Sequence, residues 1–272
     1  MSQLRIVRPR EWAWPVPPVA REVISAAPEY ADERRPPVLF VPGFGHGAWV
    51  FAEHWLEHVA ARGFPAHAMS LRGHGGSGTA PKTTLRAYVH DVVQVAASLP
   101  RQAVLVGHGA GALVVEYALA RYPARAAVLV APVLDGWRPL TAALLRNPLG
   151  TLPALVGARL RLSRRQLFSR ELPATAAREY VRRLGRASAR AQWQLIAHRA
   201  PERPVGDPPV LVVGSPDDRV VPSSSLQRAA ARHGAAPLLF PGMGHDLMLD
   251  ARWREPIDAM LDWLEQTLTD DD

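Results

Sequence analysis

Three short stretches of the chain contain the residues that could do chemistry. The first, GHGAG at residues 107–111, follows an apolar run at 103–106. A buried strand, a sharp five-residue turn and a helix in that order usually present a serine nucleophile at the third position of the turn. Here that position is Gly109, which has no hydroxyl. The sequence therefore predicts the sharp turn that normally carries a nucleophile, here called the elbow, with no nucleophilic side chain at its third position.

The other two stretches offer an acid and a base. Residues 214–222, GSPDDRVVP, contain the adjacent carboxylates Asp217 and Asp218, and His245 ends the glycine turn GMGH. A histidine after a glycine turn is, by itself, usually only polar surface. Beside a carboxylate it becomes a proton acceptor, because the carboxylate orients the imidazole and stabilises its protonated form.

The elements that must position these residues can be read from apolar runs. Runs that are apolar throughout indicate strands covered on both faces. Such runs lie at 38–41, 66–71, 103–106, 126–131, 210–213 and 237–240. Amphipathic stretches lie at 52–62, 85–99, 111–122, 223–233 and 253–268. Strands and helices in alternation predict an α/β fold with a doubly wound, mostly parallel sheet.

One segment departs from this alternation. Residues 138–206 contain no convincing strand, are rich in arginine, and are divided by prolines into short helical pieces. We expect a helical insertion that covers one end of the sheet as a cap. The predicted division is therefore a core of residues 1–137 and 207–272 with a cap of residues 138–206.

The motifs in this order resemble the α/β-hydrolase superfamily, nearest its small esterase and lysophospholipase-like members with a helical cap. The resemblance runs from about Val38 to the C-terminal helix. It includes the loop VPGFGHGAW at 41–49, the loop LRGHGGSG at 71–78, the elbow, the acid turn and the histidine turn. Elbow, acid and histidine follow each other as in that superfamily. Pro42 stands where the family often has histidine.

The resemblance implies a role for each matching residue. His245 is the expected base, and the D-x-x-V-P register selects Asp218 as its acid, with Asp217 as the alternative. Backbone N–H groups of Phe44 and Ala110 are expected to form the oxyanion hole. Gly109 takes the nucleophile's place, and because glycine adopts positive φ freely it relieves the strain that a side chain bears there.

Other residues are weaker candidates for the pocket. His46 lies in the oxyanion loop and His108 lies inside the elbow, so both are expected near the site, more as packing residues than as catalytic ones. Trp49, Trp137 and Trp193 are candidates to line a pocket for an apolar or aromatic substrate, although ordinary core packing explains them equally well. His74 has no second ligand at a suitable spacing, and we expect no metal and no cofactor.

Composition limits the partners. The chain has 272 residues, 48% of them hydrophobic, a net charge of +7 and no cysteine, which excludes disulfides, thiolate metal sites and a cysteine nucleophile. It contains no nucleic-acid-binding motif, no signal-peptide core and no apolar stretch long enough to span a membrane. We expect a cytoplasmic protein with a small-molecule substrate and neither nucleic acid nor a membrane as a partner. The sequence contains no indication of the oligomeric state.

Three functions remain open. One is an enzyme that uses the pair His245–Asp218 and the oxyanion hole for proton transfer without a covalent intermediate: cyclisation, C–C bond formation, elimination or hydration. Relatives in natural-product pathways make such an adaptation plausible. The second is a serine esterase or lactonase in which Gly109 has replaced the serine, naturally or by engineering. The third is a non-catalytic protein whose capped pocket binds a ligand.

Overall fold

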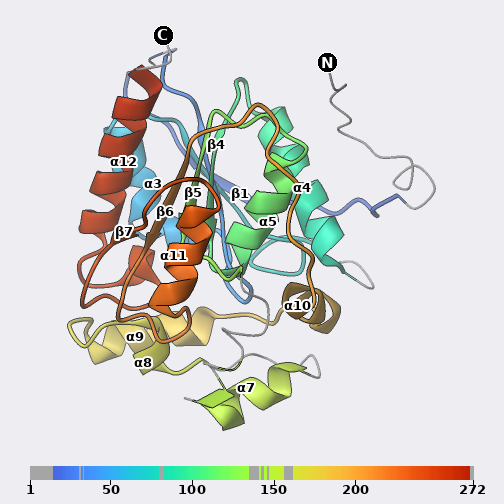
Figure 1. Cartoon of the computed structure of the whole chain (residues 1–272), viewed down its shortest axis with the longest axis vertical. Helices are drawn as coiled ribbons and strands as arrows, with labels where there is room; N and C mark the ends of the chain where they lie inside the picture. The colour runs from blue at the N-terminus through green and yellow to red at the C-terminus, as the bar shows by residue number, and fades with distance from the viewer. Residues whose placement is uncertain are drawn as a thin grey trace.

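The computed structural model describes residues 15–30, 32, 34–79, 83–134, 141, 144–145, 147–155 and 162–269. Within these residues the strands form one sheet in the order β1-β3-β2-β4-β5-β6-β7 (Figure 1). The strands are β1 (Val23–Ala26), β2 (Val38–Val41), β3 (Ala66–Met69), β4 (Val104–His108), β5 (Ala126–Val130), β6 (Val210–Gly214) and β7 (Leu238–Leu239). All pairs from β3 to β7 are parallel, which confirms the predicted α/β fold.

The edge strand β1 was not predicted. It pairs antiparallel with β3, with Val23 opposite Met69. Its first three residues are exposed or half-buried, so it lacks the continuous apolar run that marks the central strands. An edge strand needs only one covered face and one partner, and its sequence signal is correspondingly weak.

The helices cover both faces of the sheet. They are α2 (Trp49–Ala52), α3 (Trp55–Ala61), α4 (Leu85–Ser98), α5 (Ala110–Leu119), α7 (Pro148–Leu155), α8 (Arg164–Leu167), α9 (Ala174–Arg183), α10 (Ala189–Ile196), α11 (Ser223–Ala231), the 3₁₀ turn η1 (Leu247–Leu249) and α12 (Arg254–Thr269). The predicted helix at 52–62 is divided, because α2 begins earlier and α3 follows after a turn.

Alternate residues of the central strands reach opposite cores. In β2, Phe40 packs in the core shared with α3 and α12, whereas Leu39 packs in the core shared with α4 and α5. Figure 1 shows these two helix layers on either side of the strands. Coverage of both faces explains why these strands are apolar throughout.

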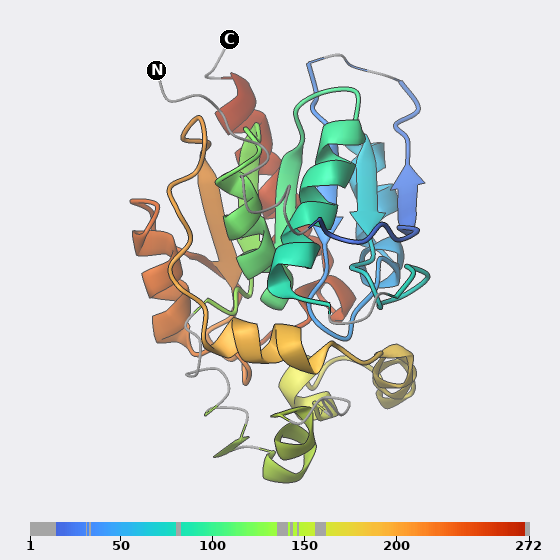
Figure 2. The same ribbon diagram turned by 90° about the vertical axis from the view of Figure 1, so that its right-hand side faces the viewer.

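Between β5 and β6 the described residues form only the helices α7 to α10, here called the insertion helices. The parallel strands point toward them, so they lie beyond the C-terminal edge of the sheet (Figure 2). This is the edge at which open α/β sheets bind ligands. None of the described helices is long and apolar enough to cross a membrane.

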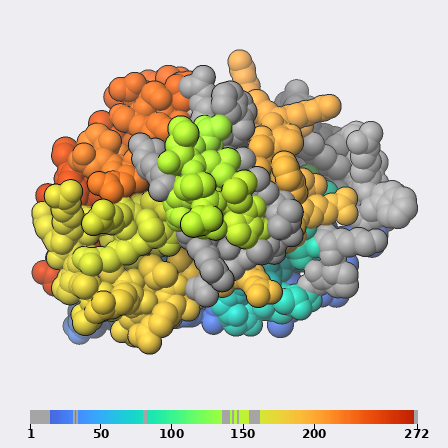
Figure 3. Space-filling view, turned by 90° about the horizontal axis from the view of Figure 1, so that it is seen from below, coloured from blue at the N-terminus to red at the C-terminus, as the bar shows by residue number. Residues whose placement is uncertain are grey.

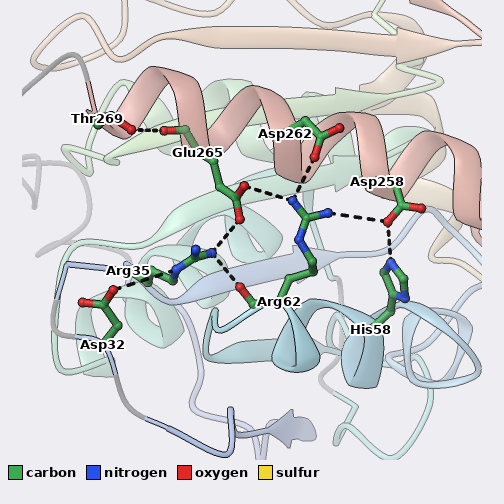
Figure 4. A network of polar contacts seen from close by, with 8 residues as sticks. All are labelled: Asp32, Arg35, His58, Arg62, Asp258, Asp262, Glu265 and Thr269. Carbon is green, nitrogen blue, oxygen red and sulfur yellow. Dashed lines mark hydrogen bonds and ion pairs between the residues drawn. The ribbon is translucent and has the colours of Figure 1, made fainter.

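Two polar networks hold helices to the core in different ways. Arg72 makes a bidentate ion pair with Asp91 of α4, with both N–O distances at 2.6 Å and both side chains buried. Near the surface, Arg62 after α3 contacts Asp262 at 2.8 Å and Glu265 at 3.0 Å, both on α12 (Figure 4). Only the first pair would leave a charge buried if one partner were removed.

We predict that Asp91→Ala lowers the free energy of unfolding by about 3–5 kcal/mol, because the guanidinium of Arg72 is left buried and unpaired. The matched change Asp262→Ala, at a carboxylate whose side chain is 60% exposed, is expected to cost less than about 1 kcal/mol. Urea unfolding of both variants measures the difference. Equal losses would contradict this ranking.

Candidate active site

The turn between β4 and α5 has the geometry of a nucleophile elbow. Gly109 precedes the first residue of α5 and adopts φ 55° and ψ −119°. Its N–H donates to the carbonyl of Val130 on β5, at 2.9 Å, which holds the turn against the sheet. A positive φ is readily available to glycine and strained for residues with a side chain.

His245 faces this turn and is bonded to an acid on its other side. A β carbon added to Gly109 would stand 3.3 Å from Nε2 of His245. Nδ1 of the same ring donates to Oδ2 of Asp218 at 2.8 Å, and both residues are buried. The structure thus brings together Gly109, Asp218 and His245, three residues that are far apart in the sequence.

The two adjacent carboxylates have different partners. Oδ1 of Asp218 accepts the N–H groups of Val220 and Val221 at 2.7 and 3.0 Å, which aims Oδ2 at the histidine. Asp217 instead accepts the N–H of Gly242 at 2.7 Å and lies at the surface. In this geometry Asp218 is the partner of the imidazole, as the D-x-x-V-P register predicts.

The environment makes His245 more basic than an ordinary histidine. Burial by itself lowers the pKa of this imidazole, but the carboxylates of Asp218 and Asp246 outweigh burial and raise the pKa above 6.5. With Nδ1 bonded to Asp218, Nε2 is the ring nitrogen that faces the space beside Gly109.

The residues expected to form the oxyanion hole lie on two backbone segments beside Gly109. Ala110 is the first residue of α5, so its backbone N–H has no acceptor within the helix. Phe44 follows Gly43, whose Cα lies 3.9 Å from the position of a β carbon on Gly109. Both segments therefore border the space in front of His245.

A second buried carboxylate, Asp246, lies behind this pair. His46 Nε2 donates to Asp246 Oδ2 at 3.1 Å, and His108 Nε2 lies 3.5 Å from Oδ1. Burial opposes ionisation, yet the three histidines 46, 108 and 245 outweigh it and lower the pKa of Asp246 below its ordinary value. Asp246 was not among the predicted site residues; its adjacency to His245 was the available signal.

His108 is a neutral member of this cluster. Complete burial, with a smaller effect from the neighbouring His245, lowers the pKa of His108 to about 3. A neutral ring whose Nε2 lies 3.2 Å from the carbonyl of His245 must donate from that nitrogen. The two predicted pocket histidines, His46 and His108, thus support the site from behind.

His108, His245 and Asp246 also form a group with possible metal-ligand atoms, all within 4.8 Å of one another. Zinc bonds of about 2.0–2.2 Å require ligand atoms no more than about 4.4 Å apart. The same side chains already bond the His245 carbonyl, Asp218 and His46. We therefore assign them to the hydrogen-bond network.

The two predicted aromatic residues that the structure describes have separate surroundings. Trp49 packs against Tyr180 and lies under the guanidinium of Arg183, 3.9 Å from the ring centroid. Trp193, on α10, is 50% exposed and lines a separate cavity of about 650 Å³ with Leu85 and others. Trp137 lies outside the described residues.

The end of α8 is bonded to the histidine turn. The N–H of Asp246 donates to the carbonyl of Leu167 at 2.9 Å. Asp250 accepts the N–H groups of Ser169 and Gly244, at 2.9 and 2.7 Å. Part of the insertion is therefore attached to the same turn that carries His245.

Comparison with known proteins agrees with this fold. Residues 38–260 match the alpha/beta hydrolase family. The chain belongs to that family. It matches no curated protein sequence.

Solved structures of the same fold are distant in sequence from this α/β-hydrolase. They include a monoacylglycerol lipase from Paleococcus ferrophilus (22% identity, TM-score 0.69, 91% of this chain and 98% of that one). A putative aryl esterase from Burkholderia cenocepacia is similar, with 20% identity and a TM-score of 0.64 over 92% of this chain and 96% of that one. A soluble variant of the Saccharomyces cerevisiae monoglyceride lipase is also similar, with 13% identity and a TM-score of 0.73 over 92% of each chain. Identities this low establish the fold alone.

We predict that the imidazole of His245 titrates above pH 6.5 and that Asp218→Asn lowers its pKa, because the variant removes the charge that stabilises the protonated ring. Histidine ring resonances followed by NMR against pH measure this shift. Asp217→Asn is the matched control and is expected to leave the titration unchanged. A shift in the control alone would assign the acid to Asp217.

We predict that Gly109→Ala lowers the free energy of unfolding by about 1–3 kcal/mol, because alanine is strained at positive φ and its β carbon crowds Nε2 of His245. Gly206→Ala isolates the backbone contribution, since Gly206 has φ 79° and no atom within 4 Å of its added β carbon. Thermal and urea unfolding compare the two. A smaller loss at Gly109 than at Gly206 would contradict crowding at the site.

Proposed function

We propose that this α/β-hydrolase is an enzyme that transfers protons without a covalent intermediate. The observation that carries the proposal is a histidine paired with a buried carboxylate that faces a glycine where a nucleophile would stand. Nε2 of His245 lies 3.3 Å from the position that a β carbon on Gly109 would take, and Nδ1 donates to Asp218 at 2.8 Å. The pair is arranged as a base, with no hydroxyl from residue 109 to deprotonate.

The proposed base acts on the substrate or on water. The imidazole takes a proton at Nε2, and Asp218 stabilises the positive charge that forms. The same nitrogen then returns the proton to another atom of the substrate. This cycle suits cyclisation, C–C bond formation, elimination and hydration, which all begin or end with a proton on carbon or oxygen.

The proposed oxyanion hole stabilises the negative charge that forms on the substrate. The N–H of Ala110 begins α5, and the positive end of the helix dipole adds to its effect. The N–H of Phe44 is the second donor. An enolate or phenolate oxygen in front of Gly109 would thus face two donors, while His245 removes the proton. We propose a small apolar or aromatic metabolite as the substrate, of the kind handled in natural-product biosynthesis.

The acyl-enzyme route is not available at residue 109. Glycine offers neither the serine of esterases nor a carboxylate nucleophile. Without a nucleophile, the oxyanion hole and binding alone supply only about 10³–10⁴-fold over water in serine proteases. Efficient hydrolysis by the usual mechanism is therefore not expected.

A second candidate is a hydrolase whose serine has been replaced. It is favoured by the structural neighbours, which include a monoacylglycerol lipase and a putative aryl esterase. In that case Gly109→Ser alone would restore ester hydrolysis, and the base would have no other use. The two candidates differ in what the unaltered chain does.

We predict that the protein accelerates the Kemp elimination of 5-nitrobenzisoxazole. In this reaction a base removes a C–H proton while the N–O bond breaks, and the electrons pass to a phenolate oxygen. The rate should rise with pH through the raised pKa of His245, because only the neutral ring accepts a proton. His245→Ala should remove most of the acceleration, and Asp217→Asn should keep it. A rate independent of residue 245 would overturn the proposed base.

We predict that Gly109→Ser forms an acyl-enzyme with p-nitrophenyl esters, detected as a mass increase, whereas the unaltered protein does not. The serine hydroxyl, one bond away from the β-carbon position, would lie beside Nε2 of His245, where it can be deprotonated. Ester hydrolysis by the variant together with a silent Kemp assay of the parent would favour the replaced-serine hydrolase. Proton transfer by the parent favours the proposed function.

A further inference from the structure

The charge of the chain is concentrated in one segment. Residues 138–206 contain 14 arginines against three carboxylates, a net charge of +11, so the remaining residues carry −4. The net charge of +7 is therefore the sum of a strongly positive segment and a slightly negative remainder. A positive region of this size attracts anionic surfaces.

Helix α7, in the same segment, is turned with its polar side inward. Asn147 caps it by accepting the N–H of Gly150 at 3.1 Å, and its side-chain amide donates to Gln166 on α8 at 3.0 Å. Thr151 is 1% exposed. In contrast, Leu149 and Leu152 are 87% and 53% exposed. A helix normally buries its leucines and exposes its polar side.

More apolar side chains lie near these leucines. Leu145, just before α7, is 86% exposed, and Trp193 on α10 is 50% exposed. Helix α10 contacts α7 directly. Figure 3 views this face: α7 stands at its centre, with α8 and α9 on one side and the α10 segment on the other. We call the face formed by α7 to α10 the insertion face.

Exposed arginines lie on, or next in sequence to, the helices of the insertion face. Arg165 on α8, Arg170 after it, Arg186 before α10 and Arg190 on α10 are all exposed. A protruding apolar helix with basic neighbours is the pattern of a segment that lies in a lipid–water interface. The leucines enter the acyl boundary, while the guanidinium groups meet anionic headgroups.

We propose that the insertion face binds to anionic lipid surfaces. This proposal differs from the expectation that the chain has no membrane partner. That expectation rested on the lack of a stretch long enough to span a membrane, whereas a helix bound at the surface does not need to span it. A second copy of the chain is a poorer occupant, since two segments of charge +11 would meet. The proposal is independent of the reaction at His245.

Vesicle flotation tests the proposal with the intact protein. Vesicles of phosphatidylcholine alone are compared with a 3:1 mixture of phosphatidylcholine and phosphatidylglycerol. We expect binding to the mixture, weak binding to the neutral vesicles, and at least a tenfold loss between 0.1 and 0.5 M NaCl, because salt screens the charges.

Leu149→Ser with Leu152→Ser should reduce the partition coefficient by about tenfold or more, since the apolar contribution is lost. Arg165→Gln should reduce it by about fivefold. Tyr30→Ser is the control, because Tyr30 is 79% exposed on the loop before β2, outside the insertion. Circular dichroism verifies that each variant is folded.

The proposal is overturned if the protein does not bind anionic vesicles, or if the double leucine variant binds them as well as the parent does. It is also overturned if sedimentation shows a dimer that the double variant dissociates, which would assign the face to a second copy. An acidic protein that binds the parent when vesicles do not would assign the face to a protein partner.

Discussion

Close approach of three backbone segments determines where everything else in the site can lie. A β carbon on Gly107 would stand 2.6 Å from Cα of Ala112, and one on Gly111 would stand 2.5 Å from the carbonyl oxygens of Val41 and Pro42. The end of β4, the start of α5 and the loop after β2 therefore touch through backbone alone. Because of this contact, the N–H of Ala110 and the loop of Phe44 border the same space, whatever side chain residue 109 bears.

Two buried carboxylates then organise the histidines around that space. Asp218 holds His245 from one side, and Asp246 connects the loop after β2, through His46, with the elbow, through His108. A carboxylate is costly to bury unless it is hydrogen-bonded or paired, so each one constrains the loops that supply its partners. Because burial keeps His108 neutral, this ring supports the cluster as a hydrogen-bond donor and adds no charge to it.

The central strands and the order of the site motifs could be predicted from the sequence, because each leaves a local signal. Apolar runs marked β2 and β4, and the D-x-x-V-P register selected Asp218, whose carboxylate bonds His245. The exposed strand β1 and the partners of Asp246 could not be predicted. Their signals depend on contacts between residues distant in the chain. The orientation of α7 could not be predicted either. Its leucines suggest a buried face, whereas Leu149 and Leu152 are exposed in the structure.

The bonds between α8 and the histidine turn divide the insertion into parts with unequal freedom to change over evolution. Alterations near Leu167 or Ser169 would displace the turn of His245, because Asp246 and Asp250 are bonded to that stretch. Within the described residues no hydrogen bond joins α7 or α10 to this turn, so their sequences can diverge while His245 keeps its position. The α8 junction is therefore the part of the insertion where substitutions are least tolerated, because they reach the imidazole through the backbone of its turn.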